Sequence, residues 1–406
     1  MFIKKCRSCN SKKLKNLFNL GKLSFTGKFA KNKKINIPKA ELGLVICDNC
    51  KLVQLNKNFN LSYLYGSDYG YRTGINKTMT DHVKKVALKA TKISKLKKGD
   101  QVLDIASNDG TLLNCYPKNV VKFGIDPTIK KFKYHYKNID FSISNFFSRE
   151  KILKKTKKKF KVISALSVFY DIEKPNKFLN DVSKLLDADG IFILEQADLL
   201  SIIKLNMFDT ICHEHLEYYS HKVIISLLSK HELEVFDFLS NDINGGSTQY
   251  FIKKINNTKF KVNRKKIQNL IKQEKKYDLD KVKTYKKFFS NINTIKKNLL
   301  HKIKNIKDKK LNIHGYGAST KGNVLLQYFN INKNHIDYIA DRNPKKKGLY
   351  TPSTKIKIVS ENFSRLKKPD YYLVLPWHFK KEILLRERSQ RKYSKFIFPL
   401  PKLIIY

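Results

Sequence analysis

Short apolar runs and longer amphipathic stretches alternate through the middle of the chain. The apolar runs have the length of strands: QVLDIAS (101–107), VVKFGID (120–126), FKVISALSVF (160–169), GIFILEQAD (190–198) and, as a late strand, NGGSTQYFIKKI (244–255). Stretches with helical patterns separate them. This rhythm predicts a parallel α/β sheet whose ligands bind at the carboxyl ends of its strands.

The same rhythm returns towards the C-terminus, where LNIHGYG (311–317), IDYIAD (336–341) and YYLVLPW (371–377) predict the strands of a second α/β unit. A Lys-rich helical stretch from 256 to about 310 leads into this unit. Residues 58–98 are expected to form a loop and then a helix, and the loop carries Tyr63, Tyr65, Tyr69 and Tyr71. We therefore expect domains at 1–57, 58–255 and 256–406.

Four of the six cysteines form two C-x-x-C pairs, Cys6 with Cys9 and Cys47 with Cys50. Each pair can place two thiolates on one side of a tight turn, and two such pairs complete a tetrahedral sulfur shell that suits zinc. Redox-active or simply buried thiols are the alternative. Because four sulfur ligands leave no open coordination position, we expect the zinc to be structural.

The chain of 406 residues has a formal net charge of +49. Its lysines are scattered through every segment, which indicates solvated surfaces rather than a nucleic-acid-binding stripe, although the charge favours an anionic, phosphate-bearing ligand. No apolar run reaches the roughly 18 residues of a membrane span. The first residues also lack the apolar stretch of a signal peptide. We therefore expect a soluble cytoplasmic protein.

The sequence VLDIASNDGTLL (102–113) has the order strand, small-residue loop and helix, with the helix expected to begin at Thr111. A carboxylate after the next strand, at Asp126, can accept hydrogen bonds from both ribose hydroxyls of a nucleoside. The loop has one glycine where a dinucleotide fingerprint has three, so S-adenosylmethionine fits better than NAD, with an ordinary structural turn as the alternative. The candidate cofactor-binding residues are Asp104, Ser107, Asn108, Asp109, Gly110 and Asp126.

A second turn of the same order follows in LNIHGYGASTKGNVLL (311–326). Its glycines keep the loop thin, and its hydroxyl and lysine side chains lie beside a predicted helix N-terminus, which suits a phosphate group. The spacing does not match a Walker A motif, so nucleotide hydrolysis is not expected. Two such turns predict two nucleotide-bearing ligands. The candidate substrate-binding residues of this turn are Gly315, Gly317, Ser319, Lys321 and Gly322.

Between the two turns lies FDTICHEHLEYYS (208–220), which brings His213, Glu214 and His215 close together in sequence. This placement suggests proton transfer between a cofactor and a second ligand. The HEHLE sequence lacks the second histidine of the zinc-protease motif, four residues on. A single histidine in a globular domain is more often structural, which is the alternative for His215.

These motifs, together with IADRNPKKKG and PDYYLVLPW, resemble the S-adenosylmethionine-dependent C-methyltransferases that act on nucleotide-activated 4-keto deoxysugars. The resemblance runs in the same order over nearly the whole chain. It implies a zinc-binding N-terminal module, a Rossmann-like methyltransferase domain and a C-terminal Rossmann-like α/β domain that helps to hold the nucleotide sugar. It also implies methylation of the carbon next to a ketone, after a base removes the proton from that carbon.

By this resemblance His215 is the base and Glu214 its neighbour, while Tyr71 belongs to the cofactor site. Tyr218 and Tyr219 either line the sugar pocket or belong to the core. Many family members have a tyrosine at the position of Cys212 and a histidine at that of Asp171. These two residues and Tyr170 are therefore further active-site candidates.

Two other functions remain open at this point. A zinc-bearing RNA methyltransferase would use the positive charge, and it would need a contiguous basic surface beside the cofactor. A non-catalytic protein that binds nucleotide sugars would keep both turns without the chemistry.

Overall fold

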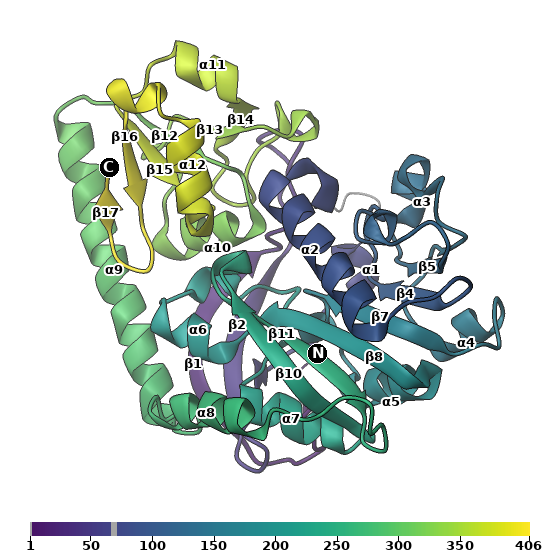
Figure 1. Cartoon of the computed structure of the whole chain (residues 1–406). Coiled ribbons are helices and arrows are strands. Elements are labelled where there is room, and N and C mark those ends of the chain that lie inside the picture. The colour runs from purple at the N-terminus through teal and green to yellow at the C-terminus, as the bar shows by residue number, and fades with distance from the viewer. Residues whose placement is uncertain (1, 66–70) are drawn as a thin grey trace.

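The computed structural model describes residues 2–65 and 71–406, and it contains three β-sheets (Figure 1). Tyr69 of the predicted aromatic loop lies outside the described residues. The mixture of sheets and helices confirms the predicted α/β class, including the second α/β unit at the C-terminal end.

The N-terminal sheet has the order β1-β2-β3-β9 and is antiparallel throughout. Three of its strands come from the cysteine-bearing N-terminal region, but β9 belongs to the segment 208–220. Val53 of β3 pairs with Tyr218 of β9, and Gln54 pairs with Glu217. The segment with the predicted base is thus fixed to the N-terminal sheet. The strands are β1 (Leu14–Ser24), β2 (Lys39–Cys47), β3 (Val53–Leu55) and β9 (Glu217–Tyr218).

The central sheet has seven strands in the order β10-β11-β8-β7-β4-β5-β6. The strands from β8 to β6 are parallel, as predicted, while β11 and β10 pair antiparallel at one end. The sequence analysis missed β6 and β10. The bounds are β4 (Gln101–Ile105), β5 (Val121–Ile125), β6 (Phe141–Ile143), β7 (Phe160–Leu166), β8 (Leu186–Ala197), β10 (Leu233–Asn241) and β11 (Ser247–Lys254).

The prediction of a helix that begins at Thr111 is wrong. The chain makes only a single 3-10 turn there, over Leu113–Cys115. Pro117 explains the early stop, because the residue before a proline is pushed out of the α region and Tyr116 is accordingly extended (φ −76°, ψ 155°). The first nucleotide-type turn is therefore followed by a single 3-10 turn, and not by an α-helix.

The C-terminal sheet has the order β14-β13-β12-β15-β16-β17 and is parallel except for β17. The helix α10 (Thr320–Phe329) follows β12 after a short loop, as predicted, and Ser319 caps it by accepting a hydrogen bond from the Gly322 amide. The strands are β12 (Ile313–Tyr316), β13 (Tyr338–Asp341), β14 (Lys357–Ser360), β15 (Tyr371–Val374), β16 (Lys395–Phe398) and β17 (Ile404–Ile405).

One long helix, α9 (Val282–Asp308), joins the C-terminal sheet to the N-terminal sheet and runs along the edge of the molecule in Figure 1. Its buried side chains recur three or four residues apart and form a single apolar stripe. Side chains of β1, α9 and the C-terminal strands belong to one continuous hydrophobic core. The stripe of α9 consists of Tyr285, Phe288, Ile292, Ile295, Leu299, Ile303 and Ile306.

The other helices cover the sheets or connect their strands (Figure 1). They are α1 (Leu61–Leu64), α2 (Lys77–Ser94), α3 (Ile129–Phe132), α4 (Arg149–Leu153), α5 (Pro175–Leu185), α6 (Leu199–Lys204), α7 (His221–Ser229), α8 (Arg264–Lys275), α11 (Glu361–Leu366) and α12 (Lys380–Arg386). Within the described part of the chain, none of the helices has both the length and the apolar character needed to cross a membrane.

Candidate active site

A cavity of about 370 Å³, here called the central cavity, lies at the carboxyl ends of the parallel strands of the central sheet. Its wall combines the first nucleotide-type turn, the segment 208–220 and the second nucleotide-type turn. The predicted site residues that line it are Tyr71, Asp104, Ser107, Asn108, Asp126, Tyr170, Asp171, Glu214, His215, Ser319 and Lys321.

Asp126 follows β5 and organises the first turn. Its Oδ2 accepts a hydrogen bond from the Asn108 amide at 3.0 Å, and its Oδ1 accepts one from the Thr128 amide at 2.6 Å. Burial raises the pKa of neighbouring Asp104 to about 7, although Ser164 donates a hydrogen bond to it at 2.7 Å. The charge of Asp126 raises the pKa of Asp104 further, so the two carboxyl groups interact.

Asp109 and Gly110 are not among the described residues that line the central cavity. The Oδ2 of Asp109 accepts hydrogen bonds from Arg72 Nε at 2.9 Å and from the Gly74 amide at 3.0 Å. Gly110 has a φ of +74°, and a Cβ there would lie 2.6 Å from the side chain of Ile139. Asn108 in turn donates to the backbone oxygen of Tyr71 at 3.3 Å. These contacts hold the segment around Tyr71 against the loop.

His215 has a defined tautomer. Its Nδ1 lies 2.7 Å from the backbone oxygen of Thr210, so Nδ1 carries the proton and donates it to that carbonyl. The lone pair of Nε2 then remains, and no side chain or backbone group of the described residues hydrogen-bonds to it. Burial and the nearby charge of Lys321 lower the pKa of His215 to about 4. The ring of Tyr170 packs edge-on against the imidazole, with 4.5 Å between centroids.

Glu214 and Cys212 are both buried and belong to the same segment as His215. Thr26, from the loop after β1, donates a hydrogen bond to Glu214 Oε2 at 3.4 Å. A Cβ on neighbouring Gly27 would lie only 2.8 Å from Glu214 Oε1. Burial raises the pKa of Glu214 and that of the Cys212 thiol. Cys212 itself is fully buried and lies outside the lining of the central cavity.

Asp171 lines the central cavity from the 3-10 turn after β7 (Phe169–Asp171). Its Oδ2 accepts a hydrogen bond from Tyr65 at 2.7 Å, whereas its Oδ1 is buried and no described residue hydrogen-bonds to it. Burial, together with the charge of Glu214, raises the pKa of Asp171 well above its usual range. A protonated carboxyl group at this position would have a donor available for a ligand.

Tyr218 and Tyr219 lie in the core and do not line either cavity among the described residues. Tyr218 donates a hydrogen bond from its hydroxyl to the backbone oxygen of His215 at 3.0 Å. Tyr219 stacks on Phe169 with 5.1 Å between ring centroids. Both tyrosines therefore support the segment that carries His215.

A second cavity, of about 230 Å³, adjoins the central one at the carboxyl ends of the C-terminal strands. Tyr71 and Ser319 belong to the walls of both cavities. Of the three predicted glycines only Gly317 lines this space, with a φ of +81° that favours glycine. Gly315 and Gly322 instead allow close packing within the C-terminal unit. The basic residues of the second cavity are Arg72, Arg342, Lys346 and Arg386.

The second cavity contains a carboxylate in the same setting as Asp126. Asp341 is the last residue of β13, and its Oδ2 accepts a hydrogen bond from the Ala318 amide at 2.8 Å. Its Oδ1 accepts one from the Asn343 amide, also at 2.8 Å. The sequence analysis missed Asp341, although its position at the end of the strand that follows a glycine turn is the same signal that identified Asp126.

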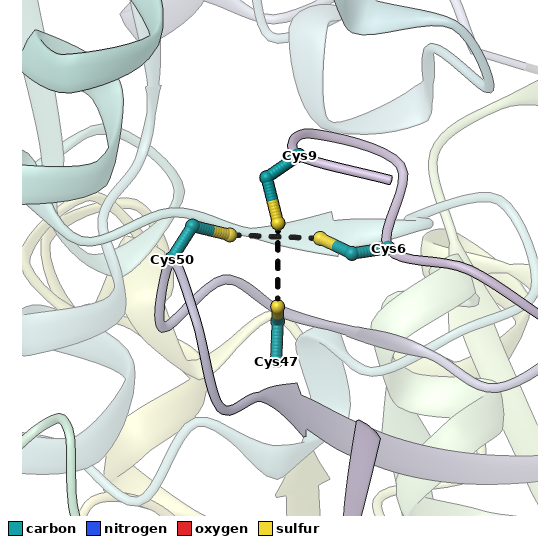
Figure 2. Close-up of side chains that lie close together, drawn as sticks. All are labelled: Cys6, Cys9, Cys47 and Cys50. Atoms are coloured by element: carbon teal, nitrogen blue, oxygen red, sulfur yellow. Dashed lines mark hydrogen bonds between the residues drawn. The ribbon is translucent and has the colours of Figure 1, made fainter. Parts of the chain in front are cut away.

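The four cysteines of the N-terminal region converge, as Figure 2 shows. The sulfur atoms of Cys6 and Cys50 are 3.5 Å apart, as are those of Cys9 and Cys47, and all four lie within 4.8 Å of one another. Zinc–sulfur bonds of about 2.3 Å in a tetrahedron place the sulfurs about 3.8 Å apart, so the geometry fits a zinc ion. The site lies outside both cavities, which fits a structural metal.

Contacts from the zinc site reach the segment with the base. Gln54 of β3 donates a hydrogen bond to Cys6 Sγ at 3.2 Å. The buried Arg7, between the first two cysteines, donates to the Leu55 backbone oxygen at 2.8 Å and lies 3.8 Å from Glu217 of β9. The zinc site, β3 and β9 are therefore one connected unit.

Three family models match the chain in the predicted order. They are "Putative zinc binding domain" over residues 6–65, "Methyltransferase domain" over 71–237 and "C-methyltransferase C-terminal domain" over 242–401. The C-methyltransferase NovU of Streptomyces niveus is 27% identical over 368 residues, which is 89% of this chain and 86% of NovU. The chain is an S-adenosylmethionine-dependent C-methyltransferase. The resemblance predicted from the sequence is thereby confirmed.

Solved structures are similar to the enzyme over less than half of its length. An S-adenosylmethionine-dependent methyltransferase from Clostridium acetobutylicum is 12% identical, with a TM-score of 0.36, and covers 43% of this chain and 92% of its own. The plantazolicin methyltransferase BamL is 16% identical, with a TM-score of 0.35, and covers 44% of this chain and 86% of its own.

The central cavity of the enzyme fits S-adenosylmethionine by the chemistry of its lining. The cofactor carries a sulfonium and an ammonium group, and acidic side chains around a cavity suit such cations. The sequence analysis missed Glu195, which follows the apolar core of β8 and hydrogen-bonds to His82 at 2.6 Å. The lining carboxyl groups are those of Asp104, Asp126, Asp171, Glu195 and Glu214.

Proposed function

We propose that the enzyme methylates the carbon next to the ketone of a nucleotide-activated 4-keto sugar. The observation that carries this proposal is the shared wall of the two cavities. One cavity contains the cofactor-type turn and a histidine with an available Nε2, and the adjoining cavity combines a nucleoside-type carboxylate with several cations. A ligand with a reactive sugar and a nucleoside diphosphate would occupy both.

His215 is the proposed base. Its Nδ1 is occupied by the Thr210 carbonyl, so the lone pair of Nε2 can take the proton from the carbon next to the ketone. The electron pair of that C–H bond forms a C=C bond, and the carbonyl oxygen becomes an enolate oxygen. S-adenosylmethionine, when bound, would supply an electrophilic methyl group, because its sulfonium sulfur can take the electron pair of the C–S bond that breaks. The enolate carbon would form the new C–C bond with that methyl group and the ketone would be restored, and His215 would then release its proton to water.

The lining of the second cavity suits the nucleoside diphosphate part of the proposed substrate. Asp341 and Asp126 each accept hydrogen bonds from a corresponding pair of loop amides, and a carboxylate so placed can bind the ribose hydroxyls of a nucleoside. Guanidinium and ammonium groups suit the diphosphate. Ser319, at the N-terminus of α10, lies on the shared wall, where a phosphate is favoured. The roles assigned to these residues are part of the proposal.

The test uses the purified enzyme with labelled S-adenosylmethionine and a panel of dTDP-, GDP- and CDP-linked 4-keto sugars. The matched control is the same nucleotide sugar with a 4-hydroxyl group in place of the ketone. We expect one new methyl group on the carbon next to the ketone, seen by mass spectrometry and NMR, and no product from the 4-hydroxy control. Methylation of an oxygen, of RNA instead of a sugar, or of none of these substrates would contradict the proposal.

A further inference from the structure

We propose that Lys321 is a catalytic residue whose ammonium group binds the ketone oxygen of the substrate and stabilises the enolate that His215 generates. This assignment rests on the proposed function and specifies a second chemical group of the same site. It also differs from the sequence-based prediction, which placed Lys321 on the phosphates of the nucleotide.

Lys321 is the only lysine or arginine that lines the central cavity in the part of the chain that the structure describes. Burial raises the pKa of three lining carboxyl groups, those of Asp104, Asp171 and Glu214, and any carboxyl group of the lining that is ionised repels an enolate. An oxyanion that forms there therefore needs a positively charged partner or a hydrogen-bond donor. The chain has 83 lysines and arginines, yet only one of the described ones lines this cavity, so its position there is distinctive.

The ammonium group of Lys321 is held by a hydrogen bond and still has N–H groups available for a ligand. Its Nζ donates one hydrogen bond to the backbone oxygen of Asn244 at 2.7 Å. An ammonium group has three N–H bonds, so two remain for a ligand. Asn244 has a left-handed conformation (φ 55°), and its side chain donates to Ser167 Oγ at 3.2 Å. The turn that carries the Asn244 carbonyl is thus itself anchored to the end of β7.

The charge of Lys321 reaches the base. Burial lowers the pKa of His215 and that of His378, which lines the same cavity, and the charge of Lys321 lowers both further. Burial lowers the pKa of Lys321, and the nearby Asp209 opposes this shift. Trp377 donates a hydrogen bond to Asp209 Oδ2 at 2.8 Å, and no described residue hydrogen-bonds to Asp209 Oδ1.

The geometry argues against a role on the diphosphate. Ser319 and Thr320 line both cavities, whereas Lys321 lines only the central one. The second cavity has its own cations, among them Lys346, which donates to the Ala318 backbone oxygen at 2.6 Å. Two lysines that each hold a carbonyl of the enzyme therefore face different cavities. This pair allows a matched experiment.

The experiment separates the proton-transfer step from binding. The enzyme is incubated in D2O with a nucleotide 4-keto sugar and without a methyl donor, and exchange of the proton next to the ketone is followed by NMR. We expect Lys321→Met to slow this exchange and kcat by about 10²–10³-fold, the loss typical of a removed oxyanion donor. The inhibition constant of the free nucleoside diphosphate should change by less than about threefold. Lys346→Met should instead raise that inhibition constant about tenfold and affect kcat less.

Three outcomes would overturn the assignment. Lys321→Met with kcat and exchange close to those of the wild type would show that the ammonium group does not act on the ketone oxygen. A raised inhibition constant with unchanged kcat would assign Lys321 to the diphosphate. If Lys321→Met does not fold, as judged by its affinity for S-adenosylmethionine, then Lys321→Arg decides, because it retains the charge and lost exchange in that variant contradicts the proposal. If the wild type accepts no nucleotide 4-keto sugar, the proposed function itself fails.

Discussion

The central and second cavities are built on the same plan but differ in charge. Asp126 follows β5 and Asp341 ends β13, and each accepts one backbone amide from the preceding turn and one from the residue two positions on. Among the described residues, the central cavity is lined by carboxyl groups with Lys321 as its lysine, whereas the second cavity combines the cations Arg72, Arg342, Lys346 and Arg386 with the carboxyl groups of Asp341, Glu361 and Glu382. Three of these cations pair with those carboxyl groups: Arg342 with Glu382, Lys346 with Asp341, and Arg386 with Glu361.

This difference indicates a division of labour. A common backbone arrangement can accept a nucleoside in either unit, and the charged side chains around it then select the ligand. Acidic walls suit a sulfonium cofactor, and basic walls suit a diphosphate. The chemistry is expected only where the two meet, at His215. Changes in the central cavity should therefore affect kcat, and changes in the second cavity should affect KM for the nucleotide sugar.

The largest effect is expected from His215→Asn. The asparagine amide can still donate to the Thr210 carbonyl, but it has no basic lone pair to replace Nε2. We expect kcat to fall by about 10²–10⁴-fold, the usual contribution of general-base catalysis, with KM for the nucleotide sugar nearly unchanged. Steady-state kinetics on the sugar identified in the substrate panel measures both constants. A His215→Asn variant with wild-type kcat would show that His215 is not the base.

Removal of zinc should lower kcat, although the zinc site lies in neither of the two cavities. Gln54→Ala removes the hydrogen bond to Cys6 Sγ, and loss of such an outer-sphere donor typically lowers metal affinity about 10–100-fold. Because β3 pairs with β9, removal of zinc should lower kcat more than it weakens nucleoside diphosphate binding. Competition with a chromophoric chelator measures the affinity for zinc. Kinetics before and after chelation measure kcat and the inhibition constant of the nucleoside diphosphate.

A matched control for Gln54→Ala is Asn49→Ala. Asn49 also donates to a cysteine sulfur, Cys9 Sγ, but at 3.6 Å and from an exposed position, so its loss should cost less zinc affinity. Full kcat in the metal-free enzyme would contradict the link between the zinc site and the base.

Seven of the parallel strands and both turns could be predicted from sequence because their signals are local; these strands are β4, β5, β7, β8, β12, β13 and β15. Each of them contains a continuous apolar run, and each turn combines small residues with a carboxylate at or after the end of the next strand. The short strands β6, β14 and β16 were not predicted. The helix after the first turn was predicted wrongly because the apolar pattern at 111–113 was given more weight than Pro117, which ends it. The same carboxylate signal was present at Asp341 and was not used.

Other features depend on contacts between distant residues. The strand β9 is only two residues long, and it exists because β3, more than 150 residues earlier, offers it an edge. The position of the Lys321 side chain depends on which cavity each side chain at the start of α10 faces. Ser319 reaches both cavities and Lys321 only one, and no local pattern in the sequence distinguishes them. The domain limits at 57 and 255 stay predictions, as does the cytoplasmic location.

Arg342→Gln tests the second cavity. Arg342 lines it and lies 3.6 Å from Glu382, so the substitution removes one cation without opening the core. We expect KM for the nucleotide sugar to rise about tenfold, as for one charge-assisted hydrogen bond, while kcat changes little. Arg264→Gln, at an exposed position at the start of α8, is the control for the loss of one charge. A fall in kcat without a change in KM would contradict the division between the cavities.

The smallest effect is expected from pH near neutrality. The base must be deprotonated, and burial lowers the pKa of His215 to about 4, so kcat should rise with pH through that value and change by less than about twofold between pH 6 and 8. Lys321 must be protonated, and its lowered pKa places the alkaline loss of kcat below the ordinary lysine value of 10.5. Asp209 opposes this shift, and His378 faces the same group. Lys321→Arg should move the alkaline limb upward, because a guanidinium keeps its proton, whereas an unmoved limb would assign it to another residue.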